Sequence, residues 1–399
     1  MSQALGRRSA SSQPKSDRSN TTPREGKNPA AQDRMYEDIL EAAGIFMHNN
    51  GKVTPTDACV TLCKALLDTA QPVPKDSLFR DDRFQETCFR LCNANEAKVI
   101  RDISPLIVPS GETLHAFGVE QLGHLTDHVN EKWYGCVPIV PPAPQPDFSI
   151  GFNKSAFSQS QLEKLGPFIK GWKYTPFLAT TSIYFPFLTC EVKCGNEALN
   201  IADRQNAHNG SVAVKQLVNL YREVSRESEL DRKILAFSVS HDHNALRIYG
   251  HYALIDGSGA RFYRHPIRKF DFTEQDGRDK WTAYKFALNV YKTFVPTHLE
   301  RIRTAIDQLP GPVPQPSQQS RGESASQLGL NDSQSTPSLL RDTVPNTPSS
   351  QTSGPSLKKR KSKSTVPNTP SSQTSGPSFK KPTRRRPRVS VVEDSNQMS

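Results

Sequence analysis

PDFSIGF (146–152) and FPFLTCEVK (185–193) are the two stretches that decide the fold of this chain. Each is an apolar, aromatic and β-branched run that contains Pro or Gly, a composition that predicts two buried strands. Asp147 begins the first strand, and Glu191 and Lys193 interrupt the second. Glu191 and Lys193 are two residues apart, so both leave the same face of a strand. A buried charge is costly unless it is paired or binds a metal. The sequence therefore predicts a cluster of two acids and a lysine at the ends of neighbouring strands.

Such a cluster suits metal-assisted hydrolysis of a phosphodiester. Two carboxylates are the oxygen ligands that Mg²⁺ prefers. A metal ion there lowers the pKa of a water and offsets charge on the phosphorus, and a lysine stabilises the developing negative charge. The alternative is structural: Asp147 ends a turn after Pro146, and Glu191 and Lys193 form an ordinary ion pair at a strand end.

Pro146-Asp147 followed by Glu191-x-Lys193 resembles the PD-(D/E)XK nuclease superfamily, whose fold is restriction-endonuclease-like. The resemblance implies that Asp147 and Glu191 are metal ligands and that Lys193 is catalytic, with Mg²⁺ (or Mn²⁺) as the cofactor. The 43 residues between Asp147 and Glu191 exceed the usual spacing in that superfamily. A short helix expected over 158–170 would absorb the excess.

Two further candidates lie on expected helices. An amphipathic helix over Glu120–Trp133, leading into a strand over Val137–Val140, would place Glu131 as one more metal ligand; the alternative is a solvated surface glutamate. A long helix from about 198 to 227 has a polar first half. The resemblance implies a Gln near the metal on this helix, which Gln205 would supply.

The remaining pattern predicts strands over Ile234–Ser240, Ala245–Leu254 and Arg261–Ile267, and helices over 33–49, 54–69, 82–93 and 279–308. We therefore expect an α/β (α+β) fold: a restriction-endonuclease-like αβββαβ core with an N-terminal helical extension and extra strands. The core also resembles a large ascomycete family of proteins of unknown function, through SLFRDDRF (77–84), NEAKVIRDISPLIVPS (95–110), PQPDFSIGF (144–152), FPFLTCEVKCG (185–195), ADRQNAH (202–208), SHDHNALRIYGHY (240–252) and WTAYKFALNVY (281–291).

Composition divides the chain into a basic tail (1–34), a helical N-terminal part of the core (35–117), the nuclease-like domain (118–310) and a Pro/Ser/Thr-rich tail (311–399). Both tails have too little apolar surface to offset the entropy of ordering, so we expect them to be disordered. The C-terminal tail has 13 Lys and Arg against 5 Asp and Glu, and the N-terminal tail has 7 against 3. The core is left with 31 basic and 32 acidic residues, so general affinity for nucleic acid would belong mostly to the tails.

The C-terminal tail repeats 343–359 at 365–381, and each copy leads into a basic cluster, at 358–363 and 380–388. Such clusters indicate nuclear import or nucleic-acid contact, so we expect import receptors as partners and a nuclear or nucleocytoplasmic protein. The alternative is a merely solubilising tail. Thr347 and Thr369, each followed by Pro, are candidate phosphorylation sites whose added charge would weaken either role.

Other signals are weaker. Cys59 with Cys63 and Cys88 with Cys92 are spaced four apart on expected helices, which favours buried core cysteines over a zinc site. The turn His241-Asp242-His243 invites a transition metal, but exposed turn residues are the favoured interpretation. No apolar run reaches about 20 residues and no secretory signal is apparent, so we expect no membrane span and, with seven cysteines, a reducing compartment.

The function expected first is that of a Mg²⁺-dependent nuclease. The alternative is an inactive module on the same scaffold that binds nucleic acid or protein in the nucleus, which the near-neutral core favours slightly. A purely structural protein is a third possibility. Basic residues that could line a substrate groove are Arg204, Arg247, Arg264, Arg268 and Lys269.

Overall fold

The computed structural model describes residue 31 and residues 35–48, 51–169, 175–194, 199–257 and 259–311. The predictions for the two tails, including the repeat, the basic clusters and the candidate phosphorylation sites, fall almost entirely outside these residues. The predictions for the core can be compared with it element by element.

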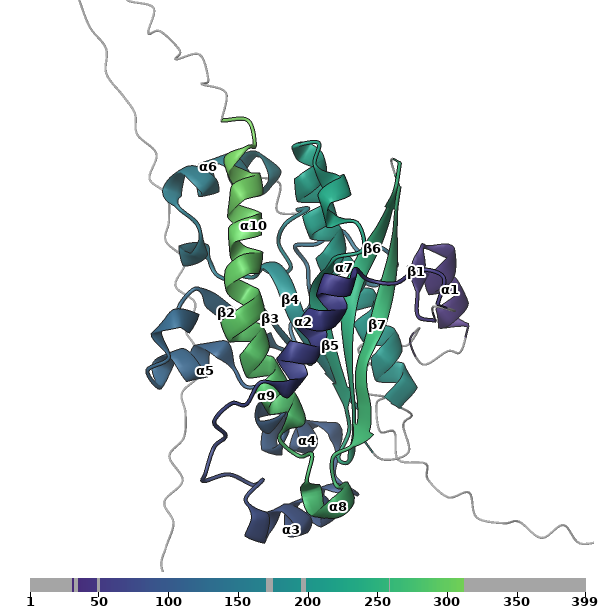
Figure 1. The fold of residues 1–399 in the computed structure, drawn as a ribbon, viewed down its shortest axis with the longest axis vertical. Helices are drawn as coiled ribbons and strands as arrows, with labels where there is room; N and C mark the ends of the chain where they lie inside the picture. Colours follow the sequence, from purple (N-terminus) through teal and green to yellow (C-terminus); the bar gives the residue numbers. More distant parts are fainter. Residues whose placement is uncertain are drawn as a thin grey trace, which may run out of the picture. The chain divides into compact units, whose positions relative to one another are not determined.

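A seven-stranded mixed sheet is the centre of this part of the chain (Figure 1), with the strand order β1-β7-β6-β5-β4-β3-β2. Neighbouring strands are antiparallel except for β1 with β7 and β4 with β5, which are parallel. The strands are β1 (Ile45–Phe46), β2 (Leu125–Val129), β3 (Phe148–Phe152), β4 (Tyr184–Val192), β5 (Ile234–His241), β6 (Ala245–Asp256) and β7 (Gly259–Asp271). The expectation of a mixed α/β fold is confirmed.

The strands β2, β3 and β4 form an antiparallel meander, and α7 (Leu199–Glu223) then carries the chain over to β5, which is parallel to β4. A parallel pair needs such a crossover because the chain must return to the same end of the sheet. The expected strands 146–152 and 185–193, the long helix after them and the three later strands are all present.

Helices cover both faces of the sheet. On one face α9 (Thr282–Asn289), a π-helical turn (Val290–Phe294) and α10 (Val295–Asp307) follow one another, and Phe237 of β5 meets Phe286 and Phe294 there in edge-to-face contacts. The helix α7 contacts β4 and β5 on the other face. The remaining helices are α1 (Tyr36–Ala42), α2 (Asp57–Asp68), α3 (Asp81–Leu91), α4 (Glu96–Asp102), α5 (Gly111–Ala116), α6 (Gln159–Ile169) and α8 (Glu274–Gly277), with short 3₁₀ turns at Ser104–Leu106, Glu120–Leu122, Lys154–Ala156 and Glu227–Leu230.

The expected helix over Glu120–Trp133 is wrong. Leu122, Leu125 and Val129 recur at helical spacing, but the chain makes a 3₁₀ turn and then β2, which pairs with β3 at the edge of the sheet. Pairing with a neighbouring strand overrides the local pattern because it satisfies the backbone of both strands. The expected strand over Val137–Val140 is not formed either, and the expected helix over 33–49 is divided into α1 and β1.

The first half of α7 is polar and yet buried. Every residue from Ala202 to Val214 is buried, among them Asp203, Arg204, Asn206 and His208. Gly210 permits this close approach, because a Cβ there would lie 2.4 Å from the ring of His251 on β6. A helix that buries polar side chains must bond them to the sheet, since unpaired polar groups in the interior are costly.

Candidate functional site

Asp147 and Glu191 come together across the pair β3–β4. The register places Phe148 opposite Cys190, so Asp147 and Glu191 are the next residues on the two strands. The backbone N–H of Val192 donates to Oδ2 of Asp147 at 2.8 Å. Ser149 and Thr189 are also opposite one another. Thr189 and Glu191 are both bonded to asparagines of α7, so these two residues of β4 lie on the face that α7 covers. The three sequence candidates therefore share one end of the sheet.

The three side chains are buried: Asp147 and Glu191 are each 1 % exposed and Lys193 is 5 % exposed. Oε1 of Glu191 accepts a hydrogen bond from Nδ2 of Asn209 at 2.7 Å. The ammonium of Lys193 donates to the carbonyl of Val192 at 2.7 Å and lies 3.5 Å from the carboxylate of Glu96 on α4.

The charges of this cluster act on its neighbours. The pKa of the Cys190 thiol is raised well above its ordinary value, first by burial and then by the carboxylates of Asp147 and Glu191, while Lys193 opposes the rise. The pKa of His241, on the opposite face of β5, is lowered chiefly by burial, and Asp147 and Lys193 act on it in opposite directions. The charges of Asp147 and Lys193 thus act on buried neighbours on both strands, and that of Glu191 acts on Cys190.

His241 corrects an expectation. The turn interpretation made it an exposed residue, but it ends β5, is fully buried and has Nε2 2.9 Å from the hydroxyl of Ser104. The two histidines of the turn do not form a metal site with Asp242: within the described ranges, no group of three or more His, Cys, Asp or Glu side chains is placed to hold a metal ion.

Gln205 is buried on α7, but the contacts described for α7 that reach Glu191 come from Asn209, four residues later. Asn206 and Asn209 lie three apart on the helix surface and face β4 and β5, whereas Gln205 lies to one side of this row. The polar spacing of Asp203, Asn206 and Asn209 is the sequence signal that would have indicated this row.

Glu131 follows Asn130, whose backbone N–H donates to the carbonyl of Asp147 at 2.9 Å. It follows β2 in a loop, because the helix that would have carried it does not form, and its Oε2 lies 2.6 Å from Nδ1 of His128. Its side chain lines a cavity of about 670 Å³ together with Lys132, Leu162 and Tyr184. Asp147, Glu191 and Lys193 do not line that cavity.

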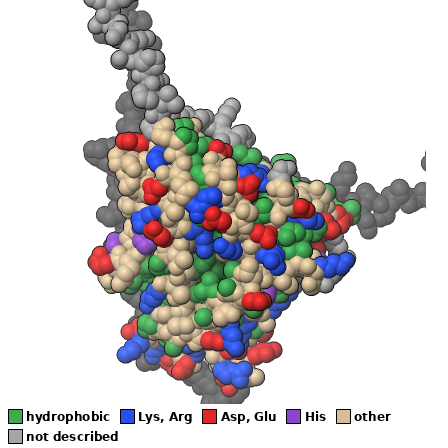
Figure 2. Space-filling view, turned by 45° about the horizontal axis from the view of Figure 1, so that its top comes forward, with side chains coloured by type: hydrophobic (Ala, Val, Ile, Leu, Met, Phe, Trp, Pro, Cys, Tyr) green, Lys and Arg blue, Asp and Glu red, His purple; other side chains and the backbone are tan. Residues whose placement is uncertain are grey.

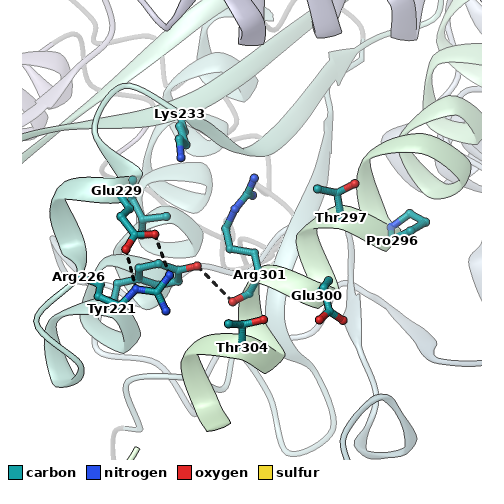
Figure 3. A pocket seen from close by; sticks show the side chains of 10 residues that line it. Tyr221, Arg226, Glu229, Lys233, Pro296, Thr297, Glu300, Arg301 and Thr304 are labelled. Atoms are coloured by element: carbon teal, nitrogen blue, oxygen red, sulfur yellow. Dashed lines mark hydrogen bonds and ion pairs between the residues drawn. The ribbon is translucent and has the colours of Figure 1, made fainter. Parts of the chain in front are cut away.

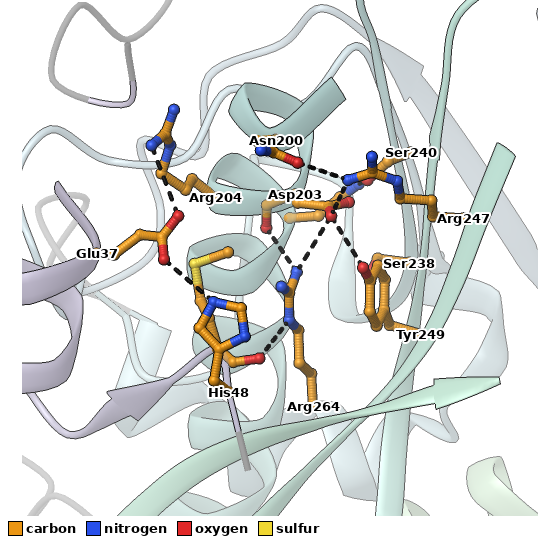
Figure 4. A network of polar contacts seen from close by, with 12 residues as sticks. Glu37, His48, Asn200, Asp203, Arg204, Ser238, Ser240, Arg247, Tyr249 and Arg264 are labelled. Atoms are coloured by element: carbon orange, nitrogen blue, oxygen red, sulfur yellow. Dashed lines mark hydrogen bonds and ion pairs between the residues drawn. The ribbon is translucent and has the colours of Figure 1, made fainter. Parts of the chain in front are cut away.

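A second polar cluster holds α7 to β6, β7 and the N-terminal segment (Figure 4). Oδ2 of Asp203 accepts hydrogen bonds from Arg247 at 2.7 Å and from the hydroxyl of Tyr249 at 2.9 Å, and lies 3.8 Å from Arg264. Arg264 also donates to the carbonyl of Met47 at 3.0 Å and stacks over Tyr249. In the same view Arg204 lies 3.6 Å from Glu37.

These contacts divide the basic residues expected to line a groove into those held in ion pairs within the fold and those that could reach a substrate. Arg204 and Arg264 are buried in ion pairs, and Arg268 lies 2.9 Å from Asp279. Arg247, with 29 % of its side chain exposed, and the exposed Lys269 are direct neighbours across β6 and β7. On the face drawn in Figure 2, Lys and Arg are interspersed with Asp and Glu, in keeping with the near-neutral core.

A further cavity of about 540 Å³ lies between α10 and the turn before β5 (Figure 3). Lys233 and Arg301 line it, and Arg226 forms a two-bond ion pair with Glu229 beside them, at 2.6 and 2.8 Å. Asp147, Glu191 and Lys193 line neither of these two cavities, nor a third of about 220 Å³ that Leu114, Tyr284 and Leu288 line. No helix among these residues has the length and apolar character to cross a membrane.

A family model described as "domain of unknown function (DUF7924)" matches residues 83–306, more than half of the chain. No curated protein and no solved structure matches the chain. The match covers β2 to β7, α7 and most of α10.

Proposed function

The chain belongs to the DUF7924 family, and we propose that its core has a restriction-endonuclease-like fold and hydrolyses phosphodiester bonds of nucleic acid with Mg²⁺. The observation that carries the proposal is the meeting of Asp147 and Glu191 across β3–β4, with Lys193 at the same end of the sheet. The order β2, β3, β4, α7, β5 supports it, because it matches the βββαβ part of the core that the sequence resemblance implies.

The residue set fits a hard divalent cation. Two buried carboxylates and one buried ammonium leave Asp147, Glu191 and Lys193 with a net negative charge, which a divalent cation would offset. Asp147 and Glu191 would hold Mg²⁺ (or Mn²⁺) through oxygen, with water at the remaining positions. When bound, the ion supplies Lewis-acid stabilisation of the phosphate.

Lys193 acts beside the carboxylates. Its hydrogen bond to the carbonyl of Val192 holds the ammonium at the end of β4. An ammonium at this place stabilises the negative charge that develops on the phosphate oxygens as the bond to the attacking water forms. Because its position is fixed in advance, it needs no rearrangement during the reaction.

Arg247 and Lys269 are the cations proposed to contact the substrate backbone. The register runs from Glu191 to Ser240 to Arg247 to Lys269 across four neighbouring strands. Strands lie about 4.8 Å apart, which puts Arg247 about 10 Å and Lys269 about 14 Å from Glu191 along this row. Each phosphate contact contributes about 0.7 to 0.9 to the slope of log K against log salt. We therefore expect Arg247→Ala with Lys269→Ala to lower that slope by about 1.5, measured by fluorescence anisotropy on labelled single- and double-stranded DNA and RNA.

The test of the function uses the full chain. Mg²⁺ and Mn²⁺ binding is measured by calorimetry, and cleavage is measured on labelled DNA and RNA. We expect Asp147→Asn with Glu191→Gln to abolish both, and Lys193→Ala to abolish cleavage while metal binding persists. Glu131→Gln is the matched control, because it makes the same carboxylate-to-amide change outside the cluster and should leave both unchanged. A folded wild-type chain that binds neither metal would refute the proposal.

The burial of the cluster favours a second candidate, a non-catalytic module on the same scaffold. Side chains with 1 to 5 % exposure offer a phosphodiester little direct access. This module would bind nucleic acid or protein in the nucleus without metal, and the samples above decide between the two: nucleic-acid binding that is unchanged by EDTA and by the Asp147, Glu191 double variant indicates the module.

We also propose that the basic clusters at 358–363 and 380–388 act as nuclear-import signals. Their charge supports this role, since import receptors recognise runs of Lys and Arg. A fluorescent fusion of the full chain should lose nuclear accumulation when both clusters are changed to alanine. Retention of the nuclear signal would refute the import role.

A further inference from the structure

Two asparagines on α7, Asn206 and Asn209, form a row that is hydrogen-bonded to the neighbouring strands β4 and β5. Asn206 is fully buried; its Oδ1 accepts a hydrogen bond from the hydroxyl of Thr189 on β4 at 2.8 Å. Its Nδ2 donates to the carbonyl of Val239 at 2.9 Å and to the hydroxyl of Ser240 at 3.0 Å, both on β5. One amide thus joins the two parallel strands directly beside the candidate cluster.

Asn209 continues this row by one helical turn and is 2 % exposed. Its Nδ2 donates to Oε1 of Glu191 at 2.7 Å, a short bond between an amide and a carboxylate in which both partners are buried. Hydrogen bonds to a charged acceptor are the stronger kind, and burial strengthens them further. The contact therefore fixes the orientation of the Glu191 side chain.

We infer that Asn209 is a positioning residue for Glu191. An amide is suited to this role because it donates a hydrogen bond without bringing a charge. A lysine or arginine at position 209 would also hold the carboxylate, but would cancel the negative charge that attracts a cation. Holding Oε1 fixes the plane of the carboxylate and so the direction in which Glu191 presents its second oxygen. The consequence for metal binding rests on the proposed function; the positioning contact itself does not.

The contact is tested first without metal, by a double-mutant cycle on the full chain in EDTA. The variants are Asn209→Leu, Glu191→Leu and the two combined, and the measured quantity is the equilibrium constant for unfolding in urea. We expect the two changes to be coupled by about tenfold or more, as contacting buried polar groups are. Asn289 provides the matched control: it is fully buried and bonded to the carbonyls of Leu66 and Thr69, so Asn289→Leu should couple to Glu191→Leu by less than about twofold.

The consequence for the metal is tested by Mg²⁺ calorimetry on the same samples. We expect Asn209→Leu to weaken Mg²⁺ binding about 10- to 100-fold, the usual effect of removing a partner that orients a metal ligand. Asn289→Leu should leave the affinity within about twofold of wild type. Asn209→Ala removes the same donor with less demand on packing, and it replaces Asn209→Leu if that variant fails to fold.

The outcomes separate the inference from the function. A wild type that binds Mg²⁺ together with an Asn209 variant that binds it equally well overturns the positioning role alone. A wild type that binds no metal overturns the proposed function, and the cycle in EDTA then decides the positioning contact. Coupling no larger than that of the Asn289 control overturns the inference in either case.

Discussion

The two faces of the sheet differ in the side chains that pack on them: one is aromatic and the other is polar. Under α9 and α10, Phe237 of β5 packs against Phe286 and Phe294 in an aromatic layer. Under α7, the neighbouring β5 residues Ser238 and Ser240 bond to His251 and Asn206. Apolar packing is non-directional and contributes through area, whereas buried polar groups stabilise only if every partner is in place. The aromatic face therefore supplies stability, and the polar face fixes the positions of particular side chains.

The largest expected effect tests the aromatic face. Phe237→Ala should lower the free energy of unfolding by about 4 kcal/mol, because it removes a fully buried ring and leaves a cavity between α9 and the sheet. Urea unfolding of the full chain measures it. Phe89→Ala is the control, since Phe89 is 80 % exposed and should change stability by less than about 0.5 kcal/mol. A loss below about 1.5 kcal/mol would mean that the aromatic layer is not the main source of stability of the fold.

The next effect concerns charge on the polar face. Asp203→Asn keeps the shape of the side chain but leaves the buried Arg264 without its carboxylate, at an expected cost of about 3 kcal/mol. The comparison is Asp279→Asn, which breaks the partly exposed pair with Arg268 and should cost less than about 1 kcal/mol. If the two variants lose similar amounts of stability, burial does not make the Asp203 ion pairs more important for stability than the exposed pair.

The smallest of the three effects is a pH dependence from the same face. Burial is the main reason that the pKa of His251 falls to about 3 and that of His208 to about 4. The pKa of a histidine in the unfolded chain is near 6.5. The contribution of each buried, neutral histidine to the free energy of unfolding is therefore complete above that pH and is lost as the pH falls below it. At pH 5 each of the two histidines should have lowered the free energy of unfolding by about 2 kcal/mol relative to pH 7.5.

Unfolding measured from pH 7.5 to 5 tests this sign. His251→Gln, or His208→Gln as a second variant, should reduce the loss by about 2 kcal/mol. His48→Gln should leave it unchanged, because the side chain of His48 is 77 % exposed. A wild type that gains stability on acidification over this range would contradict the direction.

Much of the fold follows from the sequence because its signals are local. Alternation and flanking Gly or Pro predict β3 to β7, and Thr56 begins α2 as its N-cap, accepting a hydrogen bond from the N–H of Cys59. The failures lie where the partner is distant in sequence. The stretch that forms β2 has helical spacing, and only pairing with β3 makes it a strand. The short β1 is stabilised by β7, more than 200 residues later, and no local pattern indicates it.

The candidate site divides in the same way. The spacing of Glu191 and Lys193 and the position of Asp147 predict three side chains at one sheet end, and the structure brings them together. Glu131 was placed by a helix that does not exist. The spacing of Asp203, Asn206 and Asn209 indicates a polar row on α7, but the contact of Asn209 with Glu191 depends on the angle at which α7 crosses β4, which helix periodicity does not give.

The shortest strand has a consequence for how the protein is handled. The two residues of β1 are the partner that the described chain provides for the outer edge of the 13-residue β7, and they lie outside the family match, which begins at residue 83. A fragment trimmed to that match would free the backbone of Phe262 and Tyr263 and so lengthen the part of this edge that can template strand addition between molecules. We expect such a fragment to self-associate more strongly than the full chain in light scattering. The boundary drawn by sequence similarity would then be the boundary between a soluble sample and an aggregating one.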